Sequence, residues 1–152
     1  MKIAEALIMR ADCQKRIEQL RSRLVNSAKV QEGEEPPENP QTLLVELEAT
    51  VNELTTLIKK INRTNSQTIL EDNLTVSDAL AKRDTLSLKR GVYDSLLDAA
   101  SSQRNRYSRS EIKFVSTVNV VEIQQQVDRL ARDYRLLDTK IQQANWTTEL
   151  VD

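Results

Sequence analysis

The chain has 152 residues, with 22 Lys or Arg and 23 Asp or Glu, so its net charge is −1. This length allows one domain with a core, and the near-neutral charge gives no general attraction to polyanions or membranes. Because the chain has no histidine, one cysteine and two glycines, histidine acid–base catalysis, Cys/His zinc sites and glycine-rich phosphate loops are excluded.

The first helix is predicted over about residues 3–30, where apolar residues recur at helical spacing. Its seam is interrupted by Arg10 and contains Cys13, Ile17, Leu20 and Leu24. Cys13 lies at core spacing, so we expect a buried and inert thiol. A single cysteine forms no internal disulfide, and the chain shows no signal peptide, so we expect a location in the reducing cytoplasm.

The second helix is predicted over about residues 40–62. Asn39 suits the N-cap, Pro40 suits the first helical position, and Gly33 and the two prolines that follow it cannot continue the helix before them. Apolar residues then alternate in steps of three and four, which is typical of a coiled-coil seam. This seam contains Leu44, Leu47, Val51, Leu54, Ile58 and Ile61.

Short β elements are predicted in the two long connections. Residues 68–70 and 74–76 flank a turn at 71–73 and indicate a small hairpin, and residues 112–116 are a candidate strand. The sequence leaves open whether these pieces pair within one chain or between chains.

The third helix, predicted over residues 76–101 from a capping box at Thr75, carries two apolar rows. The first row contains Leu86, Tyr93, Leu97 and Ala100, and the second contains Leu88, Val92, Leu96 and Ala99. We therefore expect this helix to pack on two sides. Arg83 and Arg90 fall at core spacing on the first row, so at least one must extend to solvent or meet a carboxylate, which suggests a polar assembly interface.

The fourth helix is predicted over residues 120–143, with Asn119 and Glu122 as a capping box. Its seam contains Val120, Ile123, Val127, Leu130, Tyr134, Leu137 and Ile141. Trp146 follows this helix, and we expect it either to fold back over the helices or to anchor in a neighbouring subunit.

These elements predict one mainly α domain over residues 1–152, an elongated antiparallel bundle of four long helices with a small β-hairpin or short strand in the connections. Charge is unevenly distributed, because residues 31–58 contain seven acids and no base, whereas residues 82–113 contain eight bases and four acids. Long seams, a two-sided third helix and this charge split favour a homo-oligomer, although the two charged portions can also meet inside one bundle.

Several segments together resemble a family of short bacterial proteins known as septicolysin-like. They are residues 1–7 (MKIAEAL), 30–36 (VQEGEEP), 61–65 (INRTN), 106–112 (RYSRSEI) and 145–150 (NWTTEL). The family name implies an oxygen-labile, membrane-active cytolysin, and the resemblance implies no catalytic residues. The sequence lacks the exposed amphipathic aromatic stretch that such a toxin needs, so we disfavour the cytolysin hypothesis.

A basic segment is the candidate site for phosphate or nucleic acid. It contains Arg104, Arg106, Tyr107, Arg109 and Lys113. Arginines around an aromatic ring are suited to gripping phosphates and stacking one base, but the same segment also suits docking on the acidic second helix.

The sequence gives little evidence for catalysis or for metal binding. The acidic residues Glu32, Glu34, Glu35 and Glu38 lack the spacing of a calcium loop, and no nucleophile motif surrounds a serine. We therefore expect no catalytic residue, no metal and no cofactor. The leading hypothesis is a non-enzymatic structural or interaction module that self-associates, with a phosphate or nucleic-acid binder as the alternative.

Overall fold

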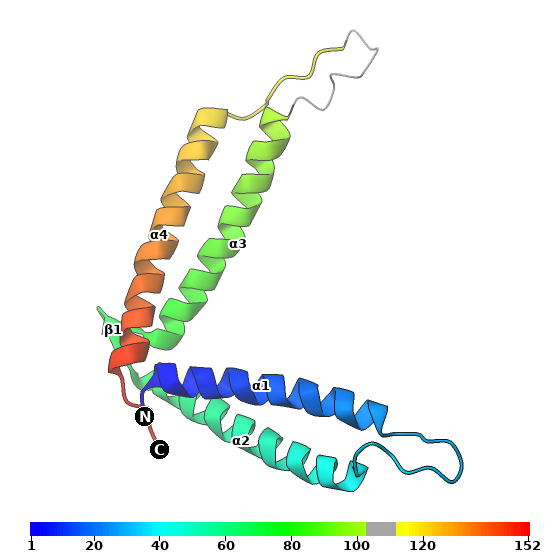
Figure 1. Ribbon diagram of the computed structural model, residues 1–152. Coiled ribbons are helices and arrows are strands. Elements are labelled where there is room, and N and C mark those ends of the chain that lie inside the picture. Colours follow the sequence, from blue (N-terminus) through cyan, green and yellow to red (C-terminus); the bar gives the residue numbers. More distant parts are fainter. Residues whose placement is uncertain (103–111) are drawn as a thin grey trace. The chain divides into compact units, whose positions relative to one another are not determined.

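The computed structural model describes residues 1–102 and 112–152, and the protein is mainly helical (Figure 1). Within these ranges the elements are helices α1 (Ile3–Asn26) and α2 (Pro40–Gln67), strands β1 (Ile69–Glu71) and β2 (Leu74–Thr75), and helices α3 (Val76–Ser101) and α4 (Val120–Thr147). Four helices with a small antiparallel hairpin in a connection confirm the predicted fold class.

The chain divides into two compact units. One contains residues 1–69 and 143–152, and the other contains residues 70–142. In the first unit α1 packs along α2, and in the second α3 lies beside α4 (Figure 1). The prediction that residues 1–152 form a single domain stays a prediction.

Each unit has its own small apolar core. In the first, Ala6 and Cys13 of α1 pack with Leu57 and Ile61 of α2. In the second, Ala79 of α3 packs with Leu137 and Ile141 of α4, and Leu70, Leu74, Leu80 and Leu86 cover them.

The predicted helix starts are confirmed by capping hydrogen bonds. The Asn39 side chain accepts from the Gln41 N–H at 2.9 Å, and Pro40 is the first residue of α2. The Thr75 hydroxyl oxygen accepts from the Asp78 N–H at 3.1 Å. Such caps satisfy backbone donors that the first helical turn leaves unpaired.

The first helix ends earlier than predicted. Instead of reaching residue 30, α1 ends at Asn26, and the Ser27 N–H bonds to the carbonyls of Arg23 and Leu24 in a tightened last turn. Residues 28–35 are all exposed, so no packing supports a longer helix. The loop then turns at Gly33, whose φ of 87° lies in the region that favours glycine.

The second and fourth helices extend beyond their predicted ends at 62 and 143. In α2, Thr64 and Asn65 are buried, and the Thr64 hydroxyl accepts from the Val151 N–H at 3.0 Å. In α4, Asn145 is buried, and the Thr148 carbonyl accepts from the Ile3 N–H at 3.1 Å. Contacts between segments far apart in the sequence therefore stabilise turns that the apolar pattern does not mark.

The predicted hairpin is confirmed, and the second candidate strand is wrong. Asp72 and Asn73 form its turn with positive φ angles of 38° and 63°, as two-residue hairpin turns require. Residues 112–116 are exposed and form no strand, and the sheet in the described residues contains β1 and β2 alone. β propensity reflects packing on a half-buried sheet surface, and all five of these residues are exposed.

The strict seam predicted for α2 is rotated relative to the core. Leu43, Thr50, Leu57 and Ile61 are buried, whereas Leu44, Val51 and Ile58 are 41%, 38% and 37% exposed. The predicted stripe therefore lies only partly in the α1–α2 core, which contains its Ile61 and packs against its Leu54, and the coiled-coil interpretation of that stripe is not supported. In α4, by contrast, the predicted seam faces inward, and Val127, Leu130, Leu137 and Ile141 are buried.

Candidate interaction surface

The two apolar rows of α3 have different environments. Leu86, Tyr93, Leu97 and Ala100 are all partly buried, as expected for a row that faces α4. In the second row Leu88 is 72% exposed, Val92 68% and Leu96 39%, and Ala99 is exposed as well. Among the described residues, therefore, only the first row is packed, and the packing expected for the second row stays a prediction.

Leu88, Val92 and Ala99 of the exposed row are part of a longer stripe, which we call the outward seam of α3. Its residues follow one another in steps of four and three, so they share one face of the helix. They are Ala81, Thr85, Leu88, Val92, Ser95 and Ala99, all exposed. The sequence pattern did not show the full stripe, because alanine, serine and threonine add little hydrophobic signal.

The two edges of the outward seam carry opposite charges. Asp84 and Asp98 lie on one edge, at helix positions just before Thr85 and Ala99. Lys82 and Lys89 lie on the other edge, just after Ala81 and Leu88. Positions before and after such a seam are those that form salt bridges between paired helices.

Gly91 lies on the same edge as Asp84 and Asp98, halfway between them. A Cβ added there would meet no atom within 4 Å, so packing within the described chain does not require a glycine at this position. Glycine inside a helix costs about 0.5–1 kcal/mol relative to alanine. The acidic edge of the outward seam is therefore open beside Val92.

Arg83, predicted for a polar interface, meets a carboxylate inside its own unit. Its Nη1 donates to Asp138 Oδ1 at 2.9 Å, and its Nη2 lies 3.3 Å from Asp84 Oδ1. Partial burial alone would lower the pKa of Arg83, but the hydrogen bonds to Asp138 and Asp84 outweigh it and raise that pKa. Arg83 thus joins α3 to α4.

The other predicted assembly residues are more exposed. Arg90 lies 3.7 Å from Asp94 within α3, and both side chains are about half exposed. Trp146 lies in the last turn of α4 rather than after it, and it is 59% exposed. The role in assembly predicted for Arg83, Arg90 and Trp146 stays a prediction.

The basic segment predicted for phosphate binding falls almost entirely outside the described residues. Arg104, Arg106, Tyr107 and Arg109 belong to the range 103–111, and Lys113 is described and exposed. Nearby, a cleft of about 430 Å³ is lined by residues of the α3 end and of 114–118. Leu96 and Ala99 contribute to it, so the second row of α3 continues into this cleft.

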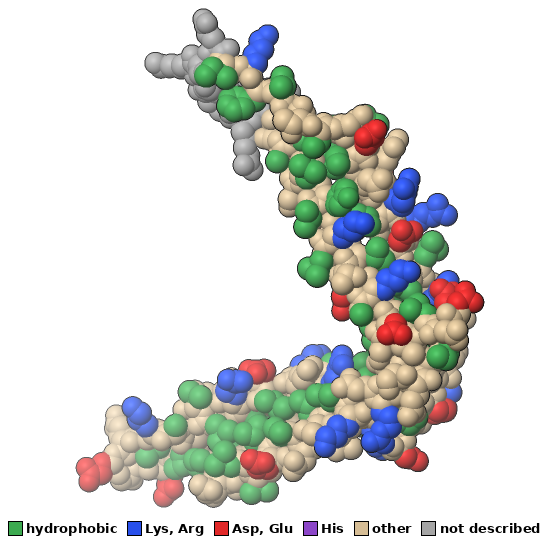
Figure 2. Space-filling view, turned by 180° about the vertical axis from the view of Figure 1, so that it is seen from behind, with side chains coloured by type: hydrophobic (Ala, Val, Ile, Leu, Met, Phe, Trp, Pro, Cys, Tyr) green, Lys and Arg blue, Asp and Glu red, His purple; other side chains and the backbone are tan. Residues whose placement is uncertain are grey.

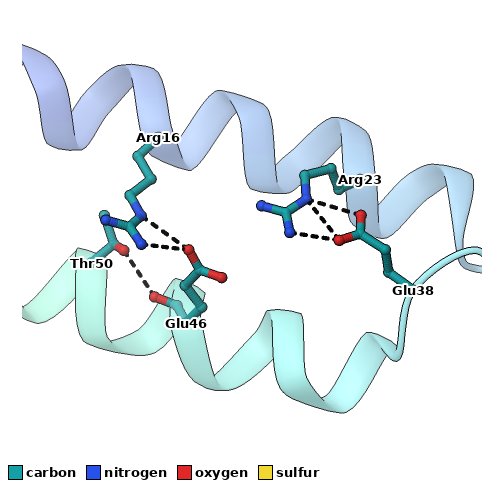
Figure 3. Close-up of polar contacts among 5 residues, drawn as sticks. All are labelled: Arg16, Arg23, Glu38, Glu46 and Thr50. Carbon is teal, nitrogen blue, oxygen red and sulfur yellow. Dashed lines mark hydrogen bonds and ion pairs between the residues drawn. The ribbon is translucent and has the colours of Figure 1, made fainter.

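Ion pairs join α1 to α2 and to the loop between them (Figure 3). Arg16 Nη2 lies 2.6 Å from Glu46 Oε1, and Arg23 Nη2 lies 2.6 Å from Glu38 Oε1. The hydrogen bond from Arg23 lowers the pKa of the Glu38 carboxyl below its usual value. Glu38, one of the four loop acids that lack the spacing of a calcium site, therefore has a structural role.

The α1–α2 unit also presents apolar side chains to solvent. Figure 2 shows hydrophobic side chains gathered along the face of this hairpin that is turned to the viewer. The exposed large apolar residues of the two helices include Ile8, Val25, Leu44, Val45 and Val51. On α2, Leu44, Val51 and Ile58 recur every seven residues, but they are 41%, 38% and 37% exposed and so less exposed than Leu88 and Val92 of α3.

Cys13 is buried, as predicted. Burial raises the pKa of its thiol, and the nearby carboxylates of Glu53 and Asp12 raise it further. A thiol with a raised pKa is a poor nucleophile at neutral pH. Across residues 1–102 and 112–152, no group of three or more His, Cys, Asp or Glu side chains is arranged to hold a metal ion.

No described helix combines the length and the apolar character that crossing a membrane requires. A membrane span needs about 20 consecutive, mainly apolar residues, and the helices here carry charged residues throughout.

Comparison with known proteins places the chain in a family without an assigned function. Residues 10–150 match the model of a family of unknown function, DUF6847, and the chain belongs to that family. A solved structure is also similar: the crystal structure of a functionally unknown conserved protein from Corynebacterium diphtheriae. It is 46% identical, with a TM-score of 0.94 over 99% of both chains. No curated protein matches.

These matches correct the resemblance stated from the sequence. The family match and the structural neighbour indicate no septicolysin-like family. Short similar segments such as residues 61–65 are weak evidence of family membership. A similarity of a few residues arises by chance more easily than a match over residues 10–150.

Proposed function

We propose that this protein is a non-enzymatic interaction module that self-associates through the outward seam of α3. The observation that carries the proposal is the exposure of Leu88 and Val92, 72% and 68%, on one face of a helix whose other face packs on α4. Single exposed apolar residues are ordinary on protein surfaces. A regular row along about five helical turns is typical of a helix that packs on another helix.

The energetics favour association of modest strength. Fully burying one leucine or valine side chain contributes about 1.5–3 kcal/mol. Two such residues on each of two copies give a sum comparable to the free energy lost when two molecules associate. The small residues of the seam, Ala81 and Ala99 among them, let the helices approach and add buried area. We therefore expect a micromolar rather than a nanomolar dissociation constant.

The chemistry of the side chains supports a role without catalysis. The chain has no histidine, and its one thiol is buried with a raised pKa. The family and the structural neighbour carry no assigned activity. Neither the described residues nor the comparisons favour nucleic-acid binding or a membrane-active toxin. The location in the cytoplasm stays a prediction.

Size-exclusion chromatography with light scattering, over about 5–500 µM protein, tests the proposal. The expected result is a mass that rises from monomer to a defined oligomer, and Leu88→Glu weakens this association about tenfold or more, because two charges would enter the seam. The matched control is Leu136→Glu, since Leu136 is an exposed leucine of α4 outside the seam.

We expect Leu136→Glu to leave the mass profile unchanged. A wild-type protein that stays monomeric over the whole concentration range contradicts self-association. Equal effects of the two substitutions would move the interface away from the outward seam of α3.

A further inference from the structure

We propose that two copies pair their α3 helices in parallel, with Asp84 of each copy facing Lys89 of the other. This inference rests on the proposed self-association and adds the identity of the partner segment, its direction and its register. The outward seam, with its two charged edges, is the part of the molecule that carries it.

The charges on the edges of the seam distinguish the two directions. When two helices pair in parallel, the residue just before one seam position faces a residue five positions further along in the partner. Asp84 lies just before Thr85, and Lys89 follows it by five positions. A parallel pair therefore places Asp84 opposite Lys89 of the second copy, twice by symmetry.

An antiparallel pair makes the opposite contacts. Like edges then face each other, and a pair centred between Leu88 and Val92 places Asp84 opposite Asp98 of the second copy. The same arrangement places Lys89 close to Lys89 of the second copy. Like charges across a helix interface are destabilising, so the antiparallel direction is disfavoured.

The two residues are accessible for these contacts. The side chain of Asp84 is 68% exposed, although it also lies 3.3 Å from Arg83. Lys89 is exposed, and its ammonium lies 5.9 Å from the Tyr93 ring centre. In a contact between Lys89 and Asp84 of a second copy, Lys89 exchanges one weak cation–π contact for an ion pair, and the Asp84 carboxylate is shared with Arg83.

The small residues at the two ends of the seam suit a close contact between the paired helices. Ala81 and Ala99 lie near its two ends, and Gly91 leaves open space beside its centre. In a parallel pair Ala81 meets Ala81 and Ala99 meets Ala99 of the second copy, whereas Gly91 faces Leu96. In an antiparallel pair centred on the seam, Ala81 meets Ala99.

Disulfide trapping tests the direction. In a Cys13→Ala background, Ala81→Cys and Ala99→Cys are oxidised separately and together, and cross-linked dimers are quantified on non-reducing gels. A disulfide forms only when the two Cα atoms lie within about 7 Å. We expect each single-cysteine protein to cross-link to itself. Exposed Ala→Cys changes on a helix should preserve the fold, which a circular dichroism melt verifies.

Cross-linking only in the mixture of the two proteins would show an antiparallel pair and overturn the inference. An oligomeric mass in light scattering without any cross-link would place the interface elsewhere and also overturn it. A protein that is monomeric in light scattering would instead contradict the proposed self-association itself, so the two failures are distinguishable.

Charge exchange provides an independent test of the register. Asp84→Lys and Lys89→Asp should each weaken association about tenfold, and the double variant should restore it, because each pair regains opposite charges. An antiparallel pair predicts the reverse for Asp84→Lys, since the new lysine would face Asp98. Stronger association of that variant would therefore overturn the proposed register.

Discussion

At the scale of single residues, partial burial decides which ion pairs contribute to the stability of the fold. Arg83 is only 22% exposed, and its pair with Asp138 links two helices. The Arg90–Asp94 pair is longer, at 3.7 Å, and about half exposed. Exposed ion pairs contribute about 0–1 kcal/mol, whereas removing one partner of a more buried pair costs more. Arg83 is therefore a structural residue of the α3–α4 unit.

The Arg23–Glu38 pair predicts a pH dependence of stability. Because Arg23 lowers the pKa of Glu38 in the folded protein, this pair stabilises the fold at pH values above the unfolded-state pKa of the carboxyl. The stabilisation is lost as the pH falls through the folded-state pKa. We expect Glu38→Gln to lower the melting temperature at pH 7 and to make little difference at about pH 2.

Melting curves followed by circular dichroism between pH 7 and pH 2 check this expectation. The matched control is Glu48→Gln, since Glu48 is an exposed acid of α2. An equal change in melting temperature for Glu38→Gln at both ends of the pH range would show that the carboxylate charge contributes nothing.

At the scale of elements, backbone chemistry accounts for where the helices and the hairpin begin. Asn39, Thr75 and Asn119 each accept a backbone N–H in the first turn of the helix that follows. These signals are local, so they are readable in a sequence. Helix ends such as those of α2 and α4 depend on contacts with distant segments, and the sequence pattern placed them too early.

The β1–β2 turn predicts a clear order of substitutions at Asn73. Its φ of 63° is left-handed, a region that glycine and asparagine tolerate and alanine does not. We expect Asn73→Ala to lower the free energy of unfolding by about 1 kcal/mol and Asn73→Gly to leave it nearly unchanged. Urea denaturation measures both. If the alanine variant were as stable as the glycine variant, the turn would not be held in this conformation.

At the scale of the whole molecule, the two ends of the described chain meet in one unit. The Leu150 N–H donates to the Met1 carbonyl at 2.8 Å, and Lys2 forms an isolated antiparallel bridge with Glu149. The Leu150 side chain packs on the core that contains Ala6, Cys13, Leu57 and Ile61. The last residues therefore complete the α1–α2 unit.

Truncating Leu150 tests this role. We expect Leu150→Ala to lower the free energy of unfolding by about 1–2 kcal/mol, because a half-buried leucine loses part of its apolar contact. Urea denaturation provides the measurement. Leu136→Ala, at a leucine that is 55% exposed, is the matched control and should change stability by less than about 0.5 kcal/mol. Equal losses for both would remove Leu150 from the core.

Local sequence was enough to predict the four helices, the caps at Asn39 and Thr75, and the hairpin turn at Asp72 and Asn73, because each depends on residues close together in the chain. Tertiary contacts decided the rest. They buried Thr64 and Asn145, turned Leu44 outward in α2, paired Arg83 with Asp138 and left Leu88 and Val92 exposed. An apolar period shows which residues share a helix face, but only the neighbouring segments determine which face is covered.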